Sequence, residues 1–161
     1  MIKSPLTLEM YFFTNIQMEA QAGAEDDSGQ GALRTYLHSS RHEDDPRRWH
    51  VSLGVEQAED KDGGCPLYTF RFEVSGLFSV DKGYPPEKTE QLIRVNGAAV
   101  LYGAIREMAA NLSARGPYPP VNLPTVTFVD EAKPEASMAQ NKPRIPTNQG
   151  RRTRKAQNAK E

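Results

Sequence analysis

The sequence contains a single cysteine, Cys65, among 161 residues, and it has no long apolar run. One cysteine excludes an intrachain disulfide and a metal site built from several cysteines. No stretch approaches the roughly 20 apolar residues that a membrane-spanning helix needs. The first residues, Met-Ile-Lys-Ser-Pro, begin no apolar segment with a cleavage site, so no secretory signal is predicted. We therefore expect a cytoplasmic protein that does not insert into membranes.

Residues that usually carry catalysis or bind metals are few and scattered. His38, His42 and His50 lack the spacing of paired metal ligands, and Cys65 has no basic neighbour that would activate its thiol. Two acidic runs, at 25–27 and 43–45, lack the alternating spacing of a calcium loop. No glycine-rich loop opens a helix to bind phosphate. We expect no catalytic residue, no metal and no cofactor, and hence no enzyme.

The net charge of −1 hides an asymmetry along the chain. Residues 141–161 carry seven Lys or Arg against one Glu, a net +6, which leaves −7 for residues 1–140. Polar residues and proline dominate from residue 130 onward, so we predict a folded domain over 1–130 and a disordered basic tail over 131–161. Such a tail could contact nucleic acid or a membrane surface. It contains no aromatic residue to stack on a base, which favours a solubilising role.

Alternating apolar and polar residues predict four strands joined by short polar connections, hence an antiparallel sheet. In the first strand the even-numbered residues from Leu6 to Ala20 form the predicted buried face, and Tyr11 and Phe13 interrupt the polar one. The aromatic side chains of the fourth strand suit a core and an apolar binding surface about equally. The predicted strands are 6–20, 32–40, 49–56 and 68–74.

After Val80 the apolar period becomes helical. Pro85-Pro86-Glu87 marks a helix start, Asn96-Gly97 interrupts as a C-cap would, and an amphipathic helix follows up to Arg115-Gly116. The next segment is rich in proline and predicted to be extended, with a short final strand at Val126 and Phe128. The predicted fold class is α+β, a four-stranded antiparallel sheet with a short helix and then one long C-terminal helix.

The predicted helices are too small to cover one face of the predicted sheet. Four strands of about 12 residues present ~750 Å² on a face, whereas a helix of about 18 residues covers ~270 Å². Exposed apolar surface of several hundred Å² marks an interface. We therefore expect a homo-oligomer and, in addition, a second kind of chain bound to the apolar surface.

Two segments resemble the SecB protein-export chaperone family. Ser75-Gly76-Leu77-Phe78-Ser79 resembles the family's Gly-x-Phe at the end of the fourth strand. Residues 105–124 resemble its Arg-Glu helix ending in Arg-Gly, then an aromatic-Pro segment and an Asn-Leu-x-Pro-like loop, here Asn122-Leu123-Pro124. The first strand, at 12–20, is also similar, so the resemblance spans about 6–128.

The resemblance implies a dimer of dimers that holds unfolded or precursor polypeptides in apolar grooves without ATP, in protein export and translocation. Client contacts are then expected from the loop after the helix, at Tyr118, Leu123, Val126 and Phe128. The family has a second amphipathic helix after this loop. Residues 130–141 contain Pro134 and little periodicity, so we expect that helix to be missing.

The resemblance also implies a surface for the translocase ATPase SecA, which is acidic in the family. The matching positions here are Asn15, Glu19, Thr69 and Arg71, and the C-terminus is basic rather than acidic. A like-charge contact in place of a favourable pair costs several kcal/mol. We expect weakened handover to SecA. Two alternatives stay open: a dedicated SecB-like chaperone for one partner, such as an antitoxin, and a nucleic-acid adaptor acting through the tail.

Overall fold

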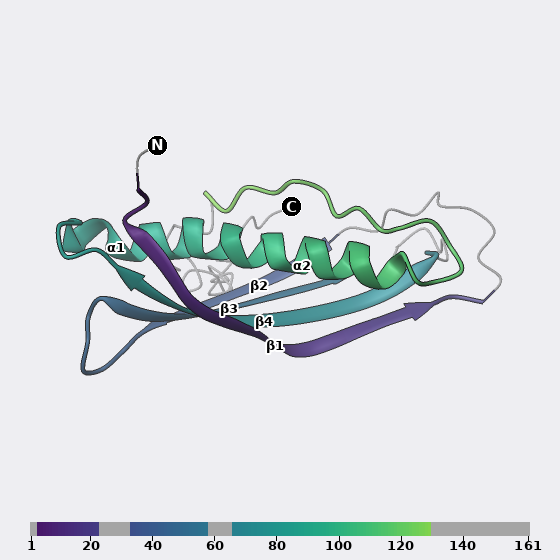
Figure 1. Cartoon of the computed structure of the whole chain (residues 1–161), viewed down its shortest axis with the longest axis horizontal. Coiled ribbons are helices and arrows are strands. Elements are labelled where there is room, and N and C mark those ends of the chain that lie inside the picture. Colours follow the sequence, from purple (N-terminus) through teal and green to yellow (C-terminus); the bar gives the residue numbers. More distant parts are fainter. Residues whose placement is uncertain (1–2, 23–32, 58–65, 130–161) are drawn as a thin grey trace, which may run out of the picture.

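The computed structural model describes residues 3–22, 33–57 and 66–129. Four antiparallel strands form one sheet in the order β1-β4-β3-β2 (Figure 1). The strands are β1 (Leu6–Ala20), β2 (Leu33–Arg41), β3 (Arg48–Gln57) and β4 (Tyr68–Val80). A helical layer follows them in the chain and covers one face, which we call the inner face; the opposite one is the outer face. The predicted fold class is confirmed.

The core lies between the inner face and the helical layer. Odd-numbered residues of β3 and even-numbered residues at both ends of β4 point inward, as the period-two pattern predicts. Phe72, Val74 and Val55 are fully buried, and they pack in the same cluster as Leu101 and Ile105 of the helical layer. This cluster fixes the long helix over the sheet.

Two β-bulges change the faces of β1. The pairing with β4 shifts register between Leu8 and Met10 and again between Phe13 and Asn15. An extra residue in one strand rotates the following side chains to the opposite face. The predicted uniform buried face is therefore wrong in the middle of β1: Met10 and Phe12 point outward, 51% and 45% exposed, opposite outer-face residues of β4.

The helical layer is one continuous rod rather than two capped helices. α1 (Pro86–Leu92) passes through a π-helical turn, η1 (Ile93–Gly97), into α2 (Ala98–Ser113). Gly97 was expected to end a helix, but it keeps right-handed helical backbone angles, φ −61° and ψ −46°. A Cβ on Gly97 would come within 3.5 Å of Val51 and 3.7 Å of Phe78. These are ordinary van der Waals distances, so the rod lies close to the sheet at Gly97 and an alanine would also fit there.

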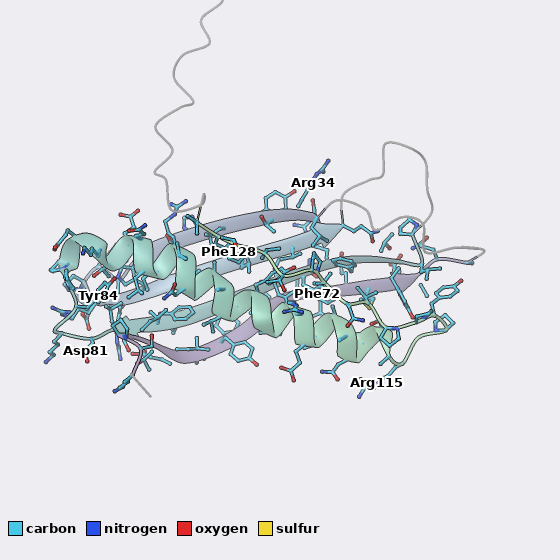
Figure 2. The ribbon with its side chains drawn as sticks, turned by 90° about the horizontal axis from the view of Figure 1, so that it is seen from above. Arg34, Phe72, Asp81, Tyr84, Arg115 and Phe128 are labelled. Carbon is cyan, nitrogen blue, oxygen red and sulfur yellow. The ribbon has the colours of Figure 1, made fainter. Side chains whose placement is uncertain are left out.

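After α2 the chain turns and runs back along the helix in an extended form (Figure 1). We call residues 119–129 the strap. It contains neither helix nor strand, so the prediction of a final strand at Val126 and Phe128 is wrong. Among the described residues no backbone hydrogen bond joins it to a strand, and it lies beside α2 instead (Figure 2).

Three sequence predictions lie outside the described residues: Cys65, the missing second helix at 130–141, and the disordered tail. Within the described ranges, none of the helices combines the length and apolar character required to cross a bilayer.

Candidate functional site

The inner face is incompletely covered along β1, which is an edge strand of the sheet. Tyr11 and Ile16 pair with the inner-face residues Gly76 and Phe72, yet each is 47% exposed. Their half-buried neighbour Phe13 stacks edge-on against Tyr11, with ring centroids 6.4 Å apart. An edge strand with exposed apolar side chains can take up another chain by backbone pairing and apolar contact together.

The strap covers a second part of the same apolar layer. Leu123 and Phe128 are 4% and 5% exposed, and the Phe128 ring packs edge-on against Tyr102, with centroids 5.9 Å apart. Val121 and Val126 are half-buried against the core cluster, as are Leu33 and Leu37 of β2. In Figure 2 the strap passes from near Arg115 to Phe128 on the β2 side of α2.

Side chains of α2 bind the backbone of the strap. The Tyr102 hydroxyl donates to the carbonyl oxygen of Pro124 at 2.8 Å, and Arg106 Nε donates to that of Leu123 at 3.1 Å. The amide of Val121 donates to Ser113 Oγ at 2.8 Å. Burial raises the pKa of Tyr102, which keeps its hydroxyl protonated as a donor, although the nearby Arg106 acts in the opposite direction.

A hydrogen-bonded latch fixes the turn between α2 and the strap. The Tyr68 hydroxyl lies 3.1 Å from the carbonyl oxygens of both Ser113 and Tyr118, and the Tyr118 amide donates to it at 3.2 Å. The Tyr118 hydroxyl in turn donates to the carbonyl of Gln21 at 2.7 Å. These bonds tie the turn to the ends of β1 and β4. We call this set, with Gly116 at its centre, the latch.

The four expected client contacts thus divide into two places. Tyr118 belongs to the latch and stacks edge-on against Tyr68, with centroids 5.7 Å apart. Leu123, Val126 and Phe128 lie in the strap, and two of them are buried. Sequence reasoning missed Tyr102, Arg106 and Ser113. Their only signal is a polar atom at positions 102, 106 and 113, which share one side of the helix.

The outer face brings together the four residues expected at a SecA-like surface. Asn15 and Glu19 of β1 pair with Glu73 and Thr69 of β4, and Arg71 lies opposite Gln17. All lie toward the end of the sheet where β1 finishes and β4 begins.

An ion-pair network neutralises most carboxylates in this region. Arg71 Nη2 lies 2.6 Å from Glu73 Oε1, and Arg71 Nη1 lies 3.9 Å from Glu56 Oε2. Arg34 approaches the other oxygen of Glu56 at 3.9 Å, and the Tyr36 hydroxyl donates to it at 2.6 Å. The hydrogen bond to Glu73 raises the pKa of Arg71, and the one to Glu56 raises that of Tyr36. Glu19 has no recorded partner among the described residues.

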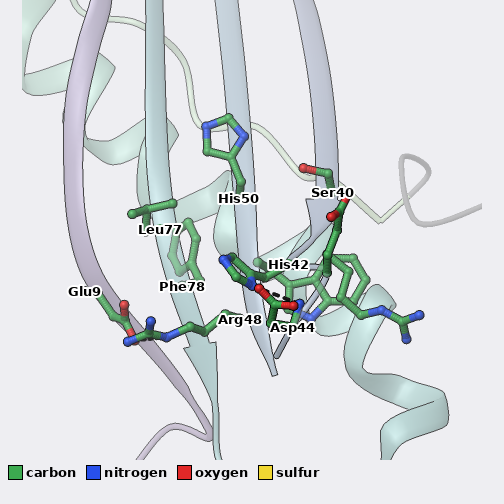
Figure 3. A pocket seen from close by; sticks show the side chains of 11 residues that line it. Glu9, Ser40, His42, Asp44, Arg48, His50, Leu77 and Phe78 are labelled. Atoms are coloured by element: carbon green, nitrogen blue, oxygen red, sulfur yellow. Dashed lines mark hydrogen bonds and ion pairs between the residues drawn. The ribbon is translucent and has the colours of Figure 1, made fainter. Parts of the chain in front are cut away.

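A shallow mixed-polarity pocket of about 570 Å³ lies at the opposite end of the sheet (Figure 3). Arg48 Nε lies 3.6 Å from Glu9 Oε1, and His42 Nδ1 accepts a hydrogen bond from the Asp44 amide at 3.2 Å. In the described part of the chain no three histidine, cysteine or acidic side chains converge to hold a metal ion. The pocket walls are balanced in charge, so they select no ligand of one sign.

Comparison with known proteins relates this architecture to one protein family. The family model described as preprotein translocase subunit SecB matches residues 7–148. The chain therefore belongs to the SecB family.

Individual relatives are distant. A protein-export protein SecB of Ruegeria sp. (strain TM1040) is 27% identical over 79 residues, 49% of this chain and 47% of that protein. The SecB of Roseobacter denitrificans is 24% identical over 132 residues, 80% of this chain and 76% of that protein. The match thus spans about half the length of the first relative and three quarters of the second.

Among solved structures, a SecB-like chaperone of Mycobacterium tuberculosis, in complex with a peptide from an antitoxin, has the same fold. The two chains superpose with a TM-score of 0.60 at 17% identity, over 76% of this chain and 91% of that one.

Proposed function

We propose that the protein is an ATP-independent holdase of the cytoplasm, which binds non-native polypeptides (clients) in protein export and performs no chemical step. The observation that carries this proposal is the incompletely covered inner face, with Tyr11 and Ile16 half-exposed on the edge strand β1. Burial of apolar surface contributes ~25 cal/mol per Å² with little dependence on sequence. Such a surface fits clients that share only exposed apolar segments.

A homo-oligomer is part of the proposal. The free edge of β1 has unpaired backbone groups and apolar side chains on both faces, including Met10 and Phe12 outside and Ile16 inside. Two copies meeting at this edge would pair the backbone and bury those side chains. SecB-family membership supports a dimer of dimers.

The client surface is proposed to include the strap and the latch, at Tyr118, Leu123, Val126 and Phe128. Tyr118 and Val126 present half-buried surface to an incoming chain. Leu123 and Phe128 are buried, so they contribute to this surface through the apolar sites that they occupy and not through direct contact with a client.

Handover to SecA is proposed to be weak. An acidic docking surface attracts a basic partner, but Glu56 and Glu73 already face Arg34 and Arg71. Glu19 is the carboxylate left at the expected positions. A basic partner would first have to break existing pairs, which reduces its gain in binding free energy.

The test is suppression of aggregation of a refolding protein, with the mass of the chaperone measured by multi-angle light scattering. Ile16→Ser is expected to weaken suppression and to lower the mass, whereas the matched outer-face change Gln17→Ser leaves both unchanged. Suppression near stoichiometric amounts supports a general holdase.

Other outcomes identify the alternatives. An oligomer that suppresses nothing but binds one peptide would contradict the general holdase in favour of a dedicated partner, the kind of complex seen for the mycobacterial structure. Nucleic-acid binding that falls steeply with salt and disappears on deleting residues 141–161 would support the adaptor function instead.

A further inference from the structure

The strap is held by contacts that would equally hold a bound peptide. Its carbonyls at Leu123 and Pro124 accept hydrogen bonds from side chains of α2, and Leu123 and Phe128 fill apolar sites. Within the described residues, no backbone–backbone hydrogen bond involves the strap. Another extended chain with carbonyl oxygens and apolar side chains at the same spacing could therefore make most of the contacts that hold the strap.

We propose that the strap occupies the client surface of the resting protein and that a client segment displaces it. This inference rests on the proposed holdase function and adds its regulation. The strap packs against the core cluster and contacts Tyr102 of α2, so its departure would uncover apolar surface next to α2. A client bound there would regain the burial that the strap gives up.

The contacts also define which client segments can replace the strap. Tyr102 and Arg106 are donors, so the incoming chain must supply carbonyl oxygens at two adjacent residues. Proline lacks an amide donor, and the strap itself carries Pro119, Pro120 and Pro124. Extended segments that contain proline are therefore accepted, provided that two apolar side chains lie five residues apart, as Leu123 and Phe128 do.

If strap and client compete for one surface, the direction in which client affinity changes on loosening the strap can be measured. When only a fraction of the molecules has the surface open, the apparent affinity for client is reduced by that fraction. Loosening the strap must therefore tighten client binding, although it removes an apolar side chain. Direct contact between Phe128 and the client predicts the opposite result.

The first experiment compares Phe128→Ala with Val129→Ala in the full chain. Val129 is the next residue and is 58% exposed, so its truncation is the matched control. The probe is reduced, carboxymethylated α-lactalbumin, and binding is measured by fluorescence anisotropy. Phe128→Ala is expected to bind at least threefold more tightly than the unmodified chain, and Val129→Ala to stay within twofold. Weaker binding by Phe128→Ala would overturn the displacement.

A reversible lock tests the same point within one protein. Cysteines replace Tyr102 and Phe128, whose rings are in contact, in a Cys65→Ser background. A bismaleimide linker with an internal disulfide then joins the strap to α2. Joining is expected to weaken probe binding at least tenfold, and reduction of the linker to restore it. Equal binding in the joined and cleaved states would refute the proposal.

Hydrogen exchange on the unmodified chain requires no substitution that could impair folding. Saturation with the probe is expected to speed exchange of the strap's Val121 amide, which donates to Ser113 Oγ, and to leave α2 protected. Slower or unchanged strap exchange would contradict displacement. If the unmodified chain and all variants fail to bind the probe, the holdase function itself is wrong. That result differs from a failure of the displacement proposal, in which the probe binds but the strap is not displaced.

Discussion

Replacing Gly116 by alanine should destabilise the protein through one contact. A Cβ built on Gly116 would overlap the Tyr68 hydroxyl oxygen and lie 3.0 Å from two ring carbons. Gly116 does not adopt a left-handed backbone conformation, so alanine is tolerated by the backbone itself. The side chain of Tyr68 must therefore move away. Its hydroxyl then loses its one donation, which is shared between the carbonyls of Ser113 and Tyr118, and the hydrogen bond that it accepts from the Tyr118 amide.

The expected loss follows from those bonds. Each intramolecular hydrogen bond contributes about 1 kcal/mol net, so Gly116→Ala should cost ~2–3 kcal/mol of unfolding free energy. For a domain of this size the midpoint temperature should fall by about 8–12 °C. Urea unfolding can be followed by fluorescence, because Trp49 is the only tryptophan and is 9% exposed in the folded domain.

A double-mutant cycle tests the cause. Tyr68→Phe removes the hydroxyl that the new Cβ would meet, so Gly116→Ala should cost no more than ~1 kcal/mol in that background. The two substitutions should then show a coupling energy of about 2 kcal/mol. Losses that simply add would refute the argument, because they would mean that Gly116 and the Tyr68 hydroxyl act independently.

Three further predictions concern the outer face and α2. Arg71→Glu should leave Glu56 and Glu73 without that partner and tighten binding to a basic partner such as SecA severalfold at low salt; unchanged affinity in calorimetry would show that the ion pairs do not limit docking. Glu56→Gln should lower the pKa of Tyr36, since the hydrogen bond to that carboxylate is the main cause that raises it; difference spectra in an alkaline titration measure the change. The raised pKa means that the Tyr36 contribution to stability is present below the ordinary tyrosine pKa and is lost as pH rises through the higher folded value. Gly103→Ala should raise stability by ~0.5–1 kcal/mol in urea unfolding, because its Cβ would meet no atom within 4 Å, and a loss would argue against this.

Periodicity predicted the sheet well where a strand is regular and less well where it is not. In β3 and β4 burial follows the alternation except at Ser75, which is buried although it lies on the outer face. In β1 the pattern was already broken by Tyr11 and Phe13, and those two residues mark the segment between the bulges. A bulge depends on pairing with the partner strand. The sequence of one strand therefore indicates an irregularity but not the position of the extra residue.

The site depends on tertiary contacts that local pattern does not encode. Proline content predicted an extended strap, but its docking on Tyr102 and Arg106 depends on where α2 lies. The ion pairs of Arg71 depend similarly on register, which places Glu56 of β3 beside it. The family resemblance therefore identified the altered outer-face position without revealing that its neighbours neutralise it.

Latch and strap are adjacent in the chain but are held in different ways, and this separates folding from binding. The latch concentrates hydrogen bonds with Ser113 and Tyr118 on the hydroxyl of Tyr68, whose loss loosens the end of the sheet. The strap is attached mainly by Leu123, Phe128 and two carbonyls, so it can leave while β4 and α2 keep their contacts. Gly116→Ala should therefore lower the free energy of unfolding, and it should reduce binding at every surface only because less of the protein is folded. Phe128→Ala should change client affinity while the outer face, on the far side of the sheet, keeps its partner affinity.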